Sequence, residues 1–138
     1  MRSSRWFFLV EFVLCAGFPK VAMADMEGRV PFVHVHYDSL GIENSGPIKV
    51  DAFQDEQGVA RLEILAFGST TAIAKPQLGV IDKYKFNSIG VSYSRGYSNV
   101  GGRTVYVLLY QAFSSGSQAV AMVVIREHGA PTVTIIKP

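Results

Sequence analysis

Two histidines and an aspartate alternate in the string His34-Val35-His36-Tyr37-Asp38. In a β-strand, side chains at positions i, i+2 and i+4 point to the same face, so this spacing would bring both imidazoles and the carboxylate together. Zinc, copper and non-haem iron accept such ligands. As one alternative, the string therefore predicts a zinc or copper site formed by His34, His36 and Asp38.

The same string resembles part of the His-x-His-x-Asp-His signature of the metallo-β-lactamase superfamily. Ser39 stands where that signature has its last histidine, the chain is shorter than that fold requires, and only His128 remains as a further histidine. The other interpretation is that His34 and His36 lie on the solvent-exposed face of an amphipathic strand. We favour this second interpretation, and the leading expectation is a protein without a cofactor.

Residues 92–103, SYSRGYSNVGGR, have the composition of a protein-binding loop. Tyrosine gives a large amphipathic contact area at low entropic cost, and arginine gives a planar fork of donors. The residues expected to contact a partner are Tyr93, Arg95, Tyr97, Asn99 and Arg103. The alternative is a long hairpin connection that needs glycine and asparagine for positive φ angles.

Motifs for catalysis are missing from the sequence. No serine lies in a Gly-x-Ser-x-Gly elbow, no Gly-Lys-Ser/Thr phosphate loop is present, and the one cysteine is Cys15. We therefore expect a protein that is not an enzyme. An enzyme whose site the sequence does not reveal is the alternative.

The first 24 residues have the pattern of an export signal. Arg2 and Arg5 precede an apolar run from Trp6 to Phe18, and Ala22-Met23-Ala24 provides the small residues that a signal peptidase recognises. A membrane span needs about 20 apolar residues, and this run is shorter and is interrupted by Glu11. We expect a signal peptide of residues 1–24, no stable membrane anchor after cleavage, and a periplasmic or secreted protein.

The charge balance changes when this leader is set aside. Of the 13 Lys/Arg and 11 Asp/Glu residues, three and one lie in the leader, which leaves ten of each. Nucleic-acid binding needs a basic patch or stripe, and no run of Lys or Arg follows Lys20. The balance therefore argues against a nucleic-acid partner.

Short alternating segments separated by turn residues cover the chain after the leader. Strands are expected at residues 29–37, 48–54, 59–67, 70–74, 88–94, 104–113, 119–126 and 132–136, with residues 80–86 as strand or loop. The run 104–113, TVYVLLYQAF, predicts a central strand that is covered on both faces.

Seven or eight short strands with frequent turns predict an all-β fold, with residues 25–138 as a single antiparallel β-sandwich or small barrel. An α+β fold with a curved antiparallel sheet, of the cystatin-like or nuclear-transport-factor-like kind, is the alternative.

These observations favour an exported small binding or interaction protein of the cell envelope, with a protein or another envelope component as its partner. An inhibitor or an immunity-type protein is the most specific form of this expectation. Ser115-Gly116 resembles, over two residues only, the Ser-Gly loop of some lysozyme-inhibitor families. The alternative is a periplasmic metal-binding protein that uses the His-x-His-x-Asp strand.

Overall fold

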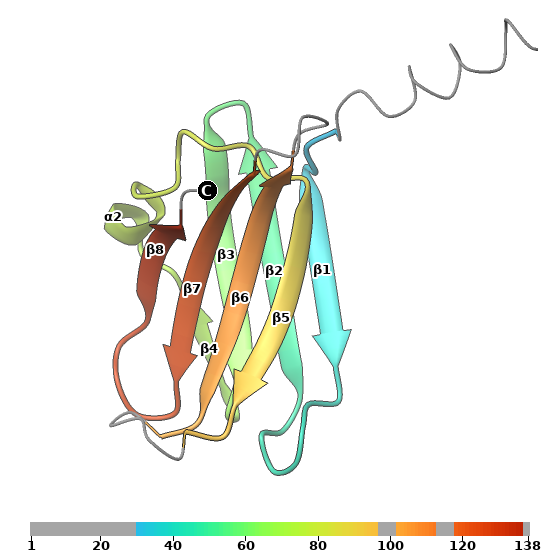
Figure 1. Ribbon diagram of the computed structural model, residues 1–138, viewed down its shortest axis with the longest axis vertical. Coiled ribbons are helices and arrows are strands. Elements are labelled where there is room, and N and C mark those ends of the chain that lie inside the picture. The colour runs from blue at the N-terminus through green and yellow to red at the C-terminus, as the bar shows by residue number, and fades with distance from the viewer. Residues whose placement is uncertain (1–29, 97–101, 113–117, 137–138) are drawn as a thin grey trace, which may run out of the picture.

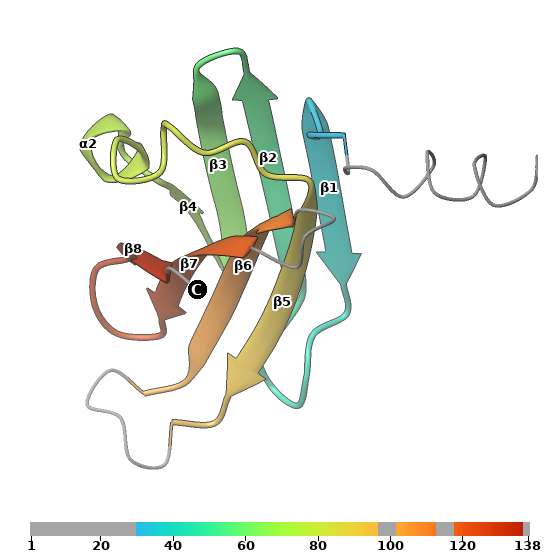
Figure 2. The ribbon, with the colours of Figure 1, turned by 45° about the horizontal axis from the view of Figure 1, so that its top comes forward.

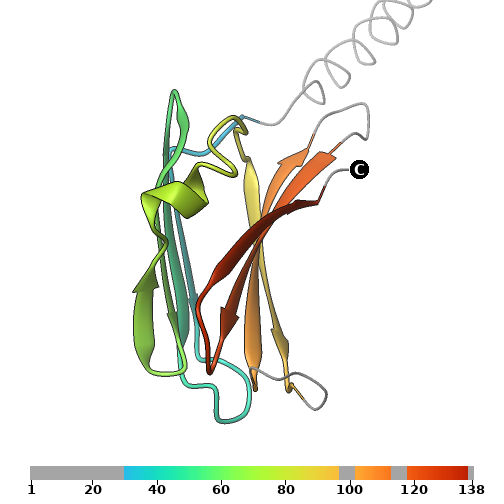
Figure 3. The ribbon, with the colours of Figure 1, turned by 90° about the vertical axis from the view of Figure 1, so that its left-hand side faces the viewer.

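Two four-stranded antiparallel sheets make up the protein in the computed structural model, which describes residues 30–96, 102–112 and 118–136. The predicted leader and the Ser115-Gly116 dipeptide lie outside these ranges. The sheets pack face to face, as the edge-on view in Figure 3 shows. The all-β prediction is confirmed, and of its two forms the sandwich is the one observed, since neither sheet closes into a barrel.

The first sheet holds strands β1 to β4 in chain order, and the second holds β5 to β8 in chain order (Figure 1). The elements are β1 (His34–Ser39), β2 (Ile48–Asp55), β3 (Gly58–Ala66), β4 (Ser69–Ala72), α2 (Lys75–Leu78), β5 (Ser88–Ser94), β6 (Thr104–Ala112), β7 (Gln118–Arg126) and β8 (Thr132–Ile136). Each strand pairs only with its neighbours in the chain, so each sheet is a simple meander.

Tight turns of the first sheet use positive φ angles, which glycine adopts most easily. The two-residue turn between β3 and β4 has positive φ at Phe67 (54°) and Gly68 (75°), the geometry of a type I′ hairpin. Gly58, at the start of β3, has φ 123° and lies so close to the Asp82 carbonyl that a Cβ atom would collide with it. The β2–β3 hairpin therefore packs directly on the segment that leads to the second sheet.

The core lies between the sheets and follows the predicted alternation. On β2, Ile48, Val50 and Ala52 are buried, and their neighbours Lys49 and Asp51 point outward. The other fully buried large side chains are Leu62, Ile64, Ile81, Phe86, Val105, Val107, Leu109 and Val123. A single apolar layer thus lies between both sheets. Each strand buries one face in this layer, and the period-2 alternation in the sequence reflects that burial.

The prediction that β6 is covered on both faces is wrong for its outer face. Val107 and Leu109 are completely buried against the first sheet, while Leu108 and Tyr110 on the opposite face are only half-buried. The Tyr110 ring lies across Gly90 on β5, within 3.2 Å of the position a Cβ would take there. Side chains within the sheet, and no third layer among the described residues, provide the partial cover.

The segment between the sheets contains a short helix that the sequence pattern did not predict. Helix α2 has four residues, with Pro76 in its first turn, and the expected strand at residues 70–74 ends at Ala72. Residues 79–87 then cross from the first sheet to the second at one end of the sandwich (Figure 2). Leu78, Ile81 and Phe86 point inward and close that end of the core.

A buried glutamine fastens this crossing segment. Gln54 is 5% exposed at the inward position near the end of β2. Its Nε2 donates to the carbonyls of Phe32 (2.7 Å) and Phe86 (2.9 Å), and its Oε1 accepts the Phe86 N–H (2.7 Å). Its own N–H donates to the Val33 carbonyl (2.8 Å). We call these four bonds the Gln54 clasp.

Core packing makes a direct prediction for β6. Leu109→Ala should lower the free energy of unfolding by about 2–5 kcal/mol, because it leaves a cavity between the sheets. Leu108→Ala is the matched control on the outer face and should cost about 1 kcal/mol. Urea denaturation of both variants tests this. Equal losses, or a Leu109 loss below about 1 kcal/mol, would contradict the assignment of the buried face.

The Gln54 clasp makes a second prediction. Gln54→Leu introduces an apolar side chain of similar size and leaves the Phe32 carbonyl and the Phe86 N–H without this partner, at about 1–3 kcal/mol for each unsatisfied group. We expect a loss of about 2 kcal/mol or more in denaturant melts. Gln57→Leu, on the exposed β2–β3 turn, is the control and should stay within about 0.5 kcal/mol of wild type. Similar stability of both variants would show that the clasp contributes little.

Candidate functional site

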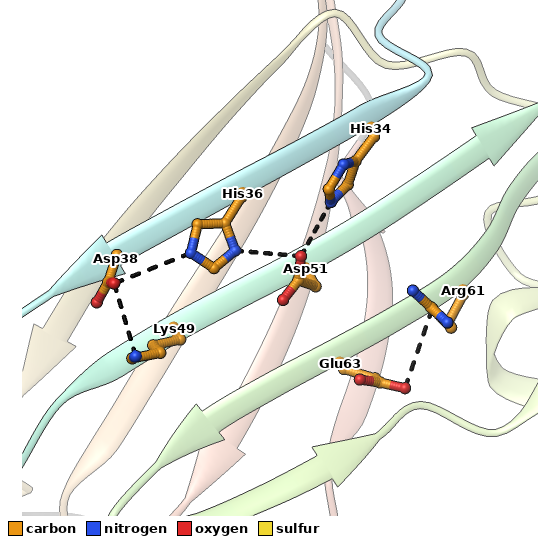
Figure 4. A network of polar contacts seen from close by, with 7 residues as sticks. All are labelled: His34, His36, Asp38, Lys49, Asp51, Arg61 and Glu63. Carbon is orange, nitrogen blue, oxygen red and sulfur yellow. Dashed lines mark hydrogen bonds and ion pairs between the residues drawn. The ribbon is translucent and has the colours of Figure 1, made fainter.

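The outer face of β1 and β2 carries a network of charged side chains, shown in Figure 4, which we call the histidine face. It contains His34, His36 and Asp38 from β1, and Lys49 and Asp51 from β2. The three β1 residues all lie on the exposed side of that strand, as their alternation predicted. Antiparallel pairing places His36 opposite Asp51 and Asp38 opposite Lys49.

Asp51 is the centre of the histidine face. Its Oδ1 lies 2.9 Å from His34 Nε2 and 3.1 Å from His36 Nδ1. An ionised carboxylate only accepts hydrogen bonds, so both ring nitrogens donate to the same oxygen. The bonds from His34 and then His36 lower the pKa of Asp51 below its usual value. Asp51 is therefore held as an anion between two imidazoles.

Asp38 contacts the other side of the His36 ring. Its Oδ2 lies 3.9 Å from His36 Nε2 and 3.6 Å from Lys49 Nζ. His36 thus has a carboxylate facing each of its ring nitrogens, and a lysine faces the outer carboxylate. Asp38 belongs to the predicted group, but it lies beside His36 and does not contact both histidines.

A stacked row fixes the other end of the histidine face. The His34 ring lies parallel to the Phe53 ring, with 3.9 Å between centroids and 7° between planes. The Arg61 guanidinium lies 4.1 Å from the same ring centroid, and Arg61 Nε is 4.0 Å from Glu63 Oε1. Cross-strand pairing of His34, Phe53 and Arg61 aligns these side chains in one row. The row holds the His34 ring in a defined plane.

Asp51 was not among the site residues expected from the sequence. The signal that would have found it is the pairing register of β1 with β2, which sets Asp51 opposite His36. That register depends on the turn between residues 40 and 47, whose length alone does not determine it.

The structure does not bring a third histidine to this face. His128 lies in the connection between β7 and β8, at the opposite side of the sandwich from β1 (Figure 1). Within residues 30–96, 102–112 and 118–136, no group of three or more His, Cys, Asp and Glu side chains is arranged to hold a metal ion as the structure stands.

A second group of charged side chains lies at the end of the sandwich where β1, β3, β5 and β7 finish (Figure 1). We call it the loop end. Arg95, just after β5, forms an ion pair with Glu43 in the β1–β2 connection. This pair joins loops that follow strands of different sheets, so the loop end is one continuous surface built from both layers.

Arg103 and Glu127 form the second ion pair of the loop end. Arg103 donates from Nε (3.0 Å) and Nη2 (2.7 Å) to the two carboxylate oxygens, and its backbone N–H also contacts Oε2 at 3.3 Å. The guanidinium lies 5.2 Å from the Phe67 ring centroid of the β3–β4 turn. These bonds lower the pKa of Glu127 to about 2 and raise the pKa of Arg103.

The predicted binding residues have different positions at this end. Tyr93 is half-buried and packs against the core, and Arg103 is held by Glu127 and Phe67. Arg95 is exposed and paired with Glu43. Tyr97 and Asn99 lie outside the described residues. The sequence did not indicate that Glu43 and Glu127 belong to this surface, because each lies far along the chain from the arginine with which it pairs.

Comparison with known proteins gives no relative: no protein-family model, no curated protein and no solved structure matches this chain. In the part of the chain that the structure describes, no helix is both long and apolar enough to cross a membrane. The site is therefore interpreted from its own geometry.

The Arg103–Glu127 pair predicts how stability responds to acid. The pKa of Glu127 falls from 4.5 to about 2 on folding, so its stabilising contribution is complete above pH 4.5 and is lost as pH falls towards 2. Glu127→Gln should be less stable than wild type at neutral pH and should lose less stability between pH 4.5 and 2. Glu56→Gln, on the exposed β2–β3 turn, is the control. Parallel pH profiles for wild type and Glu127→Gln, measured by thermal melts, would contradict this.

Proposed function

We propose that this protein is a small exported binding protein of the cell envelope that contacts a protein partner through its loop end. The observation that carries the proposal is the Arg95–Glu43 ion pair, which connects loops from the two sheets. Binding residues are commonly carried on loops that a rigid scaffold positions. Here two packed sheets provide the scaffold.

The loop end has features that suit protein recognition. The Arg95 side chain is 58% exposed while its partner Glu43 orients it. Arginine and tyrosine are the residues that most often dominate the energy of protein interfaces. Loops that are already held in place lose less entropy on binding, which favours affinity. The Arg103–Glu127 ion pair supports this surface. It joins the start of β6 to the end of β7, and the Arg103 guanidinium packs on Phe67 of the β3–β4 turn.

The cellular location and partner class in this proposal come from the sequence. The leader pattern of residues 1–24 supports export, and equal numbers of acidic and basic residues after it argue against nucleic acid. An inhibitor or immunity-type protein acts by surface binding alone, which agrees with the lack of catalytic motifs in the sequence. The proposed partner is thus an envelope protein or an incoming toxin.

Capture of the partner tests the proposal. The protein is immobilised, an extract of the cell envelope is passed over it, and bound proteins are identified and then titrated. The variants Arg95→Ala and Tyr97→Ala should each weaken binding by about tenfold or more, because such anchors contribute about 2 kcal/mol each. Both variants should keep the thermal stability of wild type to within a few degrees.

Lys49→Ala is the matched control, because Lys49 is also an exposed cation paired with a carboxylate, but on the histidine face. It should bind the partner like wild type. Equal capture by wild type and both loop variants would remove the loop end as the binding site. Loss of capture in Lys49→Ala alone would move the site to the first sheet.

A further inference from the structure

We propose that His34, His36 and Asp51 bind a divalent ion of the zinc–copper class on the exposed face of the first sheet. This site is separate from the loop end and is independent of the proposed partner. It differs from the group expected from the sequence, because Asp51 on the neighbouring strand takes the central position and Asp38 a supporting one.

The distances between the ligand atoms carry the proposal. His34 Nε2 and His36 Nδ1 lie 2.9 Å and 3.1 Å from Asp51 Oδ1. Ligands bound to one tetrahedral zinc ion at about 2.0–2.1 Å lie roughly 3.3 Å apart. Both nitrogen–oxygen distances are therefore a few tenths of an ångström shorter than the separation of two zinc ligands. The described residues hold no group arranged for a metal ion as the structure stands, so the proposal requires the Asp51 carboxylate to turn and the two imidazoles to converge on the ion.

The chemistry and exposure of the donor set also fit. Imidazole nitrogen suits zinc and copper, and a carboxylate completes three protein ligands. The side chains of His34, His36 and Asp51 are 45%, 46% and 35% exposed. An ion can therefore reach the site from solvent and keep water in its remaining positions.

Neighbouring side chains orient two of the ligands. Phe53 stacks on the His34 ring at 3.9 Å and fixes its plane. Asp38 faces the remaining nitrogen of His36, as carboxylates commonly do behind metal-binding histidines. Lys49 in turn contacts Asp38. Ring orientation is thus set before any ion arrives, which reduces the entropy lost on binding.

The charge of this face favours a cation. Three carboxylates face outward here, from Asp38, Asp51 and Glu63, against two cationic side chains, Lys49 and Arg61. With both imidazoles neutral, the form that binds metal, the face carries one excess negative charge. A divalent ion at Asp51 is therefore attracted by its surroundings.

Titration of the full chain with zinc chloride in chelator-free buffer tests the proposal by calorimetry. We expect one zinc ion per chain and no uptake of Mg²⁺, which prefers all-oxygen sites. His36→Ala and Asp51→Asn should each weaken zinc binding at least tenfold. Asp38→Asn should weaken it less, because Asp38 acts through His36. His128→Ala, the matched histidine control outside the site, should bind zinc like wild type.

A second measurement protects the result against misfolded variants. In the wild-type protein, zinc should shift the NMR signals of the His34 and His36 rings but not those of His128, and it should raise the melting temperature. Three outcomes would overturn the proposal: no zinc uptake by wild type, equal affinity in wild type and His36→Ala, or zinc shifts at His128 that match those at His36. The last would show adventitious binding to any exposed histidine.

Discussion

A single buried amide determines how the two sheets are joined. Gln54 occupies an inward position where its strand would otherwise continue the apolar pattern, and a buried amide without partners would destabilise the fold. Its hydrogen bonds instead satisfy backbone groups of Phe32 and Phe86. The entry to the first sheet and the entry to the second are therefore fixed at one point. His34 follows Phe32 by two residues, so the same clasp sets where the histidine face begins.

Charged contacts in this protein orient side chains more than they stabilise the fold. The pairs of the histidine face are largely solvent-exposed, and exposed ion pairs contribute about 0–1 kcal/mol. Their value lies in geometry. Asp51 aligns two imidazoles, and the forked Arg103–Glu127 contact holds the ends of two strands next to the Phe67 turn. Both candidate sites thus rest on a core whose stability comes from apolar packing between the sheets.

Much of the fold followed from the sequence, because period-2 alternation and turn residues are local signals. They located seven strands to within two residues at each end, whereas the strand expected at residues 29–37 spans His34–Ser39. Alternation also placed His34, His36 and Asp38 on one face. Contacts between distant segments were beyond such signals. The meeting of Asp51 with His36 depends on strand register, the Arg95–Glu43 pair on sheet packing, and helix α2 on the need to close the end of the core.

The meander order of the strands has a consequence for how the chain folds. Every strand pairs with a neighbour in sequence, so hairpin closure involves short loops and little loss of chain entropy. Contacts of long sequence separation arise mainly when the two finished sheets meet. Folding rates rise as contacts become more local, so the pairing within each sheet favours fast folding and the contacts between the sheets are the non-local ones that oppose it. Residues 73–87 are the covalent link between the two sheets, and their length sets the effective concentration of one sheet around the other.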